Sequence, residues 1–174
     1  MKRSFWIYGL FGFAVTALGG TLLHFLYDLL GEALWIAPFS GVNESTFEHM
    51  KLMFWPMFAF ALLERLFIQE REDFWCVKLR GILLALTLIP LLFYTYNGVI
   101  GKSPDFVNIS IFFVSAAIAY AYETRLFNLK KLDTCRGKLA FIAISVIAIL
   151  FVTFTFMPPK IGLFLDPVTG KYGI

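Results

Sequence analysis

The sequence predicts an all-α integral membrane bundle of about five transmembrane helices, with almost no soluble domain. Hydrophobic residues make up 59% of the 174 residues and charged residues only 16%, whereas soluble domains contain roughly 45–50% and about 25%. A chain of this length folded in water would leave much of that apolar surface wet. The apolar residues also fall into runs of about 20, the length that crosses the hydrocarbon core of a bilayer.

Five such runs follow one another along the chain. They are Phe5–Leu30, Glu44–Ile68, Leu79–Ile100, Phe106–Tyr122 and Leu139–Met157. The first is too long for the apolar region of a signal peptide and lacks a small-residue cleavage site, so we interpret it as an uncleaved span. Pro158 and Pro159 end the last run because proline cannot continue helical hydrogen bonding. Two units are therefore expected, a helical domain at 1–157 and an extracytoplasmic tail at 158–174 that packs on the mouth of the bundle.

The distribution of basic residues predicts the orientation. With the N-terminus inside, inner segments hold eleven of the fifteen Lys and Arg residues, and an excess of positive charge marks cytoplasmic segments. The C-terminus is then extracytoplasmic. Cys76 and Cys135 would face the cytoplasm, where thiols stay reduced. The net charge of +3 is too small to indicate a nucleic-acid partner.

Ionisable and polar residues are concentrated at one predicted level, the outer ends of the first two spans. They are His24, Asp28, Asn43, Glu44, Ser45, Glu48, His49 and Lys51, and they include both histidines of the chain. Charged groups cost about 2.5–3.5 kcal/mol at the centre of a membrane helix, so ionisable groups within spans suggest a functional site.

The first span has a four-residue repeat that predicts a packing seam. Gly12, Thr16, Gly20, His24 and Asp28 recur every fourth position, which places them on one helix face. Small residues at this spacing let membrane helices approach closely. We expect His24 and Asp28 to continue the seam; the alternative is that His24 makes only an interhelical hydrogen bond.

The start of the second span has a functional and a structural interpretation. Glu44, Glu48, Lys51 and Trp55 fall on one stripe at helical spacing. However, Ser45 and Glu48 also fit a capping box. In the structural interpretation Glu48 caps, Glu44 favours the positive end of the helix dipole, and Lys51 neutralises either carboxylate.

Other polar residues have weaker signals. Asn97 shares a helix face with Tyr94, and this face either lines the same outer cavity or packs against a neighbour. Glu64 and Glu123 lie at predicted inner helix ends near arginines, so we expect interfacial ion pairs.

Two blocks carry a resemblance to a known family. Residues 42–51 read Val-Asn-Glu-Ser-Thr-Phe-Glu-His-Met-Lys and run into Phe54-Trp55-Pro56, and the tail contains Leu163-Phe-Leu-Asp-Pro-Val-Thr-Gly-Lys-Tyr-Gly173. The chain resembles a family of small, uncharacterised bacterial membrane proteins with an NES-x-x-EH-x-K block and a similar tail. The resemblance implies that block and tail belong together, but implies no activity.

The tail has turn chemistry at Asp166 and Pro167. We expect it to act as a lid, with Asp166, Thr169 or Tyr172 near Lys51, His49 or Asn43. The alternative is an interfacial anchor in the headgroup region.

Three classes of function fit these features. The first is an enzyme acting on a lipid-like substrate. Its catalytic candidates, which are also tentative ligands for a divalent metal such as zinc, are His24, Glu44, Glu48 and His49. Asp28 would orient His24 and Lys51 would support the carboxylates, and without metal a His–Glu acid–base pair remains.

The second class is a transporter or channel component whose polar cluster is an outer vestibule. The third is an accessory protein whose cluster is structural or binds a membrane partner. Besides the lipid bilayer, the expected partners are thus a lipid-like substrate or another membrane protein.

Overall fold

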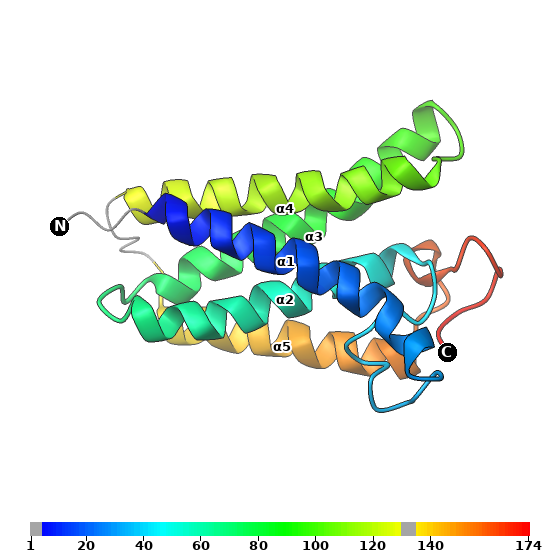
Figure 1. Cartoon of the computed structure of the whole chain (residues 1–174), viewed down its shortest axis with the longest axis horizontal. Coiled ribbons are helices and arrows are strands. Elements are labelled where there is room, and N and C mark those ends of the chain that lie inside the picture. The colour runs from blue at the N-terminus through cyan, green and yellow to red at the C-terminus, as the bar shows by residue number, and fades with distance from the viewer. Residues whose placement is uncertain (1–4, 130–134) are drawn as a thin grey trace.

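The computed structural model describes residues 5–129 and 135–174 and confirms the all-α fold class. The helices are α1 (Phe5–Leu29), α2 (Thr46–Phe67), α3 (Phe74–Val99), α4 (Asp105–Asn128) and α5 (Gly137–Phe156), followed by the short 3₁₀ helix η1 (Gly162–Phe164). The five long helices run back and forth along one axis, so that the start of α1 and the C-terminus lie at opposite ends (Figure 1).

The surface of the bundle is apolar along its length. Four helices, α1, α3, α4 and α5, are long and apolar enough to cross a membrane. On α1, Leu10, Phe11 and Leu18 are 68%, 63% and 74% exposed. Lipid is the solvent in which such a surface is stable, and the chain is a polytopic membrane protein.

The helix α2 differs from the other four. The second run was expected to be a fifth span, but α2 is not among the helices apolar enough to cross a membrane by composition. Its 22 residues correspond to about 33 Å at the helical rise, and it contacts each of the other four long helices. Glu48, Lys51 and Glu64 are buried, so the charges that lower its hydropathy face protein rather than lipid.

The predicted seam on α1 is confirmed for its small residues. Gly12, Thr16 and Gly20 are buried, and the hydroxyls of Thr16 and Tyr120 on α4 share a hydrogen bond of 2.7 Å. Beyond Gly20 the seam opens: His24 is half-buried and Asp28 is exposed. The expectation that Asp28 continues the packing face is therefore wrong.

The two cysteines correct a second expectation, that both thiols are free. Cys76 and Cys135, which are 59 residues apart in sequence, form a disulfide bond. Cys76 lies in the first turn of α3 and Cys135 just precedes α5. The two are brought together because α3 and α5 are neighbours that start at the same end of the bundle.

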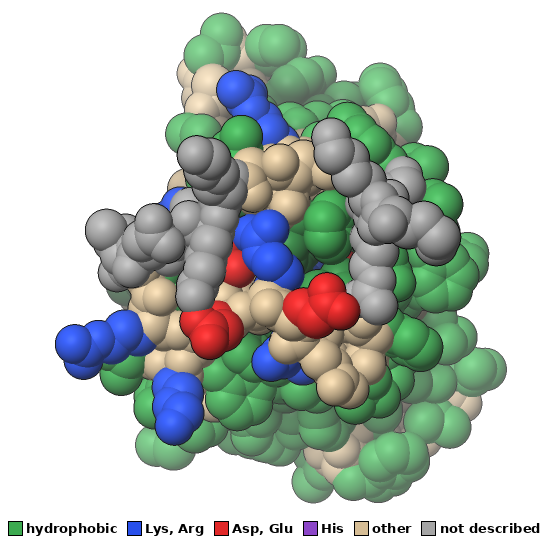
Figure 2. All heavy atoms as spheres, turned by 90° about the vertical axis from the view of Figure 1, so that its left-hand side faces the viewer, with side chains coloured by type: hydrophobic (Ala, Val, Ile, Leu, Met, Phe, Trp, Pro, Cys, Tyr) green, Lys and Arg blue, Asp and Glu red, His purple; other side chains and the backbone are tan. Residues whose placement is uncertain are grey.

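The two ends of the bundle have different characters. We call the end with residues 68–73 and Cys135 the disulfide end, and the end with residues 30–45, 100–104 and 157–174 the cavity end. Viewed onto the disulfide end, Lys, Arg, Asp and Glu side chains gather near the middle, with hydrophobic side chains around much of the periphery (Figure 2). There Arg71 pairs with Asp73 at 2.7 Å and donates to the carbonyl of Phe127 at 2.9 Å.

Candidate functional site at the cavity end

The start of α2 is built by the capping chemistry that the sequence indicates. Ser45 is the N-cap, and its hydroxyl accepts from the Glu48 backbone N–H at 3.4 Å. Asn43 accepts from the Ser45 N–H at 2.9 Å and donates its side-chain amide to the Gly173 carbonyl at 3.0 Å. The block at 43–51 is thus fixed both to its own helix and to the tail.

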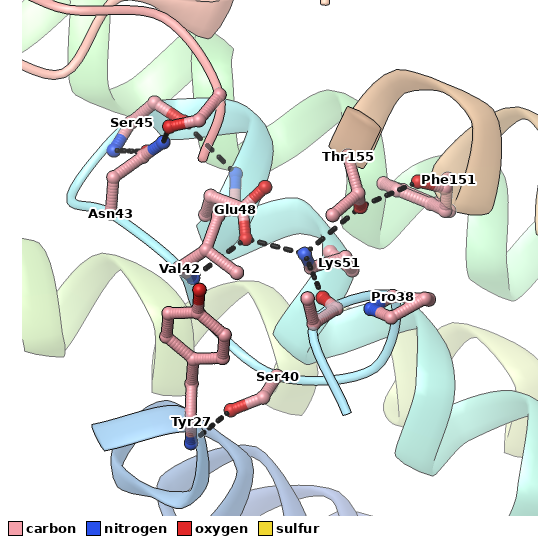
Figure 3. A network of polar contacts seen from close by, with 12 residues as sticks. Tyr27, Pro38, Ser40, Val42, Asn43, Ser45, Glu48, Lys51, Phe151 and Thr155 are labelled. Atoms are coloured by element: carbon pink, nitrogen blue, oxygen red, sulfur yellow. Dashed lines mark hydrogen bonds and ion pairs between the residues drawn. The ribbon is translucent and has the colours of Figure 1, made fainter. Parts of the chain in front are cut away.

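Glu48 and Lys51 form a buried pair in the interior of this end (Figure 3). Their charged atoms are 2.5 Å apart, with side chains 3% and 0% exposed. Glu48 also accepts from the Val42 N–H at 3.0 Å. The Lys51 ammonium donates to the Ala37 carbonyl at 2.8 Å and the Thr155 hydroxyl at 3.1 Å. Through these hydrogen bonds the pair joins the 30–45 connection to α2 and α5, so its role is structural.

The two histidines meet a different carboxylate, Glu44. His24 Nε2 lies 3.7 Å from one Glu44 oxygen and His49 Nε2 lies 3.7 Å from the other. The imidazole centroids are 5.9 Å apart. Side-chain exposure is 31% for His24, 25% for His49 and 48% for Glu44, so the group is open to a ligand.

A cavity of about 450 Å³ lies beside this group. One side has the polar residues His24, Glu44, Thr46 and His49. The other side comes from the end of α3, the start of α4 and their connection, and the tail contributes Pro167 and Val168. Further lining residues are Ile89, Phe93, Asn97, Lys102, Ser103, Asp105, Asn108, Ile109, Ile111 and Phe112.

The polar part of the second wall is held in place by its own hydrogen bonds. Ser103 donates its hydroxyl to Asn108 at 2.7 Å and its backbone N–H to Asn97 at 2.9 Å. Of these residues only Asn97 had a signal in the sequence, its place on a polar helix face. Ser103 and Asn108 reach the cavity because the connection at 100–104 folds over the ends of α3 and α4.

The structure divides the predicted site residues into two groups. His24, Glu44 and His49 line the cavity. Glu48 and Lys51 belong to the internal pair, and the exposed Asp28 is not among the cavity residues. Within residues 5–129 and 135–174, no group of three or more His, Cys, Asp or Glu side chains is arranged to hold a metal ion.

The tail contacts the block at 43–51 through Phe164 and Gly173. The Phe164 ring lies 4.4 Å from that of Phe47, centroid to centroid, and Gly173 accepts the hydrogen bond from Asn43. The Asp166 carboxylate instead accepts from the Val168 and Thr169 N–H groups of its own turn.

A second buried ionic cluster lies near the disulfide end, where we expected interfacial pairs with arginine. Glu64 and Glu123 instead both approach the ammonium of Lys78, each at 2.5 Å. Charges close to predicted helix ends were the one feature of the sequence that pointed to these residues, and they did not indicate this grouping.

Comparison with known proteins identifies the family but no activity. No curated protein and no protein of solved structure matches the chain. A family model described as a family of unknown function, DUF6512, matches residues 1–174. On this match over its whole length, the chain belongs to the DUF6512 family.

Proposed function

We propose that the cavity binds a lipid-like molecule and that His49, Glu44 and His24 act on its polar group by acid–base chemistry. The observation that carries the proposal is the meeting of two imidazoles with one half-exposed carboxylate in the wall of a cavity. A His–Glu pair supports proton transfer if it lies within reach of the reacting group, and distances in unliganded sites are often longer than in the reacting complex.

The hydrogen bonding of His49 supports a role as proton acceptor. Its Nδ1 lies 3.0 Å from the Ser45 carbonyl oxygen, and because a carbonyl only accepts, Nδ1 carries the proton. In the neutral ring, Nε2 is then the acceptor, and it faces Glu44 across 3.7 Å, too far for a direct hydrogen bond. A substrate hydroxyl beside the two atoms, within hydrogen-bond distance of both, would donate its proton to one of them.

Apolar residues in the lining of the cavity support a lipid-like substrate. Ile89 and Phe112 are buried, and Phe93 is half-buried, so an alkyl chain would find an apolar surface there. Ligand pockets of roughly 300–1,000 Å³ combine apolar walls with a few placed polar groups, and the cavity of about 450 Å³ fits that description.

Glu48 and Lys51 enter this proposal as positioning residues. Glu48 accepts a hydrogen bond from the backbone N–H of Val42, two residues before Glu44. Lys51 donates a hydrogen bond to the backbone carbonyl of Ala37 in the 30–45 connection. They keep the segment that carries Glu44 against α1 and α2. Asp28, exposed and away from the cavity, has no role in it.

We further propose that the cavity faces away from the cytoplasm, as the Lys/Arg asymmetry indicates. The disulfide bond argues in the opposite direction, because disulfides are rare in the cytosol outside redox-active and hyperthermophile proteins. The asymmetry has more weight because it is summed over many residues. A C-terminal alkaline phosphatase fusion should be active and a C-terminal green fluorescent protein fusion dark; the reverse pattern would invert the topology.

Binding is tested by native mass spectrometry of protein purified from membranes. We expect a co-purifying lipid on the wild type. Ile111→Trp should remove it, because Ile111 lines the cavity on α4. Ile118→Trp is the matched control, since Ile118 is 43% exposed on the same helix. Equal lipid on both variants would contradict binding in the cavity.

Chemistry is tested with protein in liposomes of a total polar lipid extract, followed by mass spectrometry of the lipids. A product made by wild type should be lost in His49→Gln and Glu44→Gln and retained in Asp28→Asn. Wild-type protein that converts no lipid, or a product that survives both cavity substitutions, would reject the acid–base role.

A further inference from the structure

The cluster near the disulfide end joins three helices around one ammonium. Lys78 on α3 lies 2.5 Å from Glu64 on α2 and 2.5 Å from Glu123 on α4. All three side chains are 2–3% exposed. Glu64 is one helical turn from the end of α2, so the cluster is buried just inside the bundle. None of these residues contributes to the cavity, so the inference is independent of the proposed function.

The surroundings of Lys78 are aromatic. Its Nζ lies 5.6–5.8 Å from the ring centroids of Phe60, Phe74, Tyr120 and Phe127. Arg65 and Arg71 contact Phe74 and Phe127, with their guanidinium carbons 5.6 and 5.7 Å from the ring centroids. Tyr120 shares its hydroxyl with Thr16 of α1, and Tyr8 and Tyr122 pack on the adjoining apolar cluster.

The charges within the cluster do not balance if both glutamates are ionised. One ammonium would face two carboxylates, which leaves one negative charge in a buried apolar setting. An uncompensated buried charge is very costly, and in practice such a group takes up a proton. Moreover, Glu123 Oε1 is buried and accepts no hydrogen bond within the part of the chain that the structure describes.

We propose that Glu64, Lys78 and Glu123 form a binding site for one exchangeable proton. In the neutral state of the cluster, one glutamate is a carboxylic acid and the other is paired with the Lys78 ammonium. Two carboxyl groups that share a site commonly hold one proton between them. Phe74 and Phe127, whose rings lie near the Lys78 ammonium, belong to the buried apolar cluster that also contains Ile68, Val77 and Leu126.

Infrared difference spectroscopy of purified protein in lipid nanodiscs at neutral pH tests the site. Wild type minus Glu123→Gln should show the carbonyl band of a protonated carboxylic acid, shifted when H₂O is replaced by D₂O. The same band should appear in wild type minus Glu64→Gln, because either substitution leaves one carboxylate balanced by Lys78. Glu70→Gln, which changes an exposed glutamate, should give no band.

Two results would overturn the proposal. One is the absence of a carboxylic acid band from both difference spectra, which would mean that both glutamates are ionised. The other is a band in only one of them, which would mean that one glutamate is protonated irrespective of the other. The glutamine variants keep the size of the side chain, and thermal unfolding in the same nanodiscs checks that they are folded.

Discussion

Two buried lysines, at opposite ends of one bundle, are neutralised in different ways. Lys51 at the cavity end faces one carboxylate, and its remaining donors go to the Ala37 carbonyl and the Thr155 hydroxyl. Lys78 near the disulfide end faces two carboxylates and a set of aromatic rings. The first arrangement is balanced in charge and complete in hydrogen bonds, whereas the second has an excess carboxylate.

This difference separates a structural ion pair from a site that titrates. A balanced, fully hydrogen-bonded pair has no excess charge for an added proton to neutralise, so Glu48–Lys51 fixes the connection at 30–45 in place. An unbalanced cluster gains by binding a proton, so Glu64–Lys78–Glu123 is suited to respond to its surroundings. Burial is the same at both sites, and the number of carboxylates decides which behaviour follows.

The largest expected effect breaks the balanced pair. Glu48→Gln leaves the Lys51 charge buried and unpaired, which should lower the free energy of unfolding by about 3–5 kcal/mol. Glu123→Gln removes the excess carboxylate and leaves Lys78 paired with Glu64, so it should change the free energy of unfolding by less than about 1 kcal/mol. Urea unfolding of both variants in the same detergent measures the contrast, and equal losses would show that the two clusters are not different in kind.

A smaller effect comes from the glycine beneath Glu123. A Cβ at Gly81 would overlap the Glu123 side chain, which Lys78 holds in place. Gly81→Ala should therefore destabilise by about 1–3 kcal/mol, the usual cost of overpacking. Gly98→Ala on the same helix is the control, because a Cβ there would meet no described atom within 4 Å. A stable Gly81→Ala protein would mean that Glu123 moves freely.

The fold was largely predictable because apolar runs of membrane length are a strong signal. The errors lie where charges occur. The third helix begins at Phe74 rather than Leu79, and the fourth continues to Asn128 rather than ending at Tyr122. Charges at Lys78 and Glu123 suggested helix ends at the membrane interface, but these residues neutralise one another inside the bundle. A single sequence does not show which charges will meet across helices.

The candidate site was predictable in part. The concentration of both histidines near one block indicated His24, Glu44 and His49. The sequence interpretation placed Glu44 and Glu48 on the same helix face and so missed that their side chains have different partners. Ser45 is the N-cap and Glu44 precedes the helix, so helical spacing does not apply to Glu44. The disulfide was missed because the two cysteines are 59 residues apart, and sequence spacing carries no information on their proximity.

The smallest expected effect on stability is at Glu44, four residues before Glu48 in the same block. Glu44 is half-exposed, and its contacts to His24 and His49 are 3.7 Å, so Glu44→Gln should change the free energy of unfolding by less than about 1 kcal/mol. Urea unfolding beside Glu48→Gln makes the comparison within one motif. A loss from Glu44→Gln as large as that from Glu48→Gln would make Glu44 a structural residue. A stable Glu44→Gln protein that retains its bound lipid but forms no product would place the function of this carboxylate in the chemistry, because neither folding nor binding would then depend on its charge.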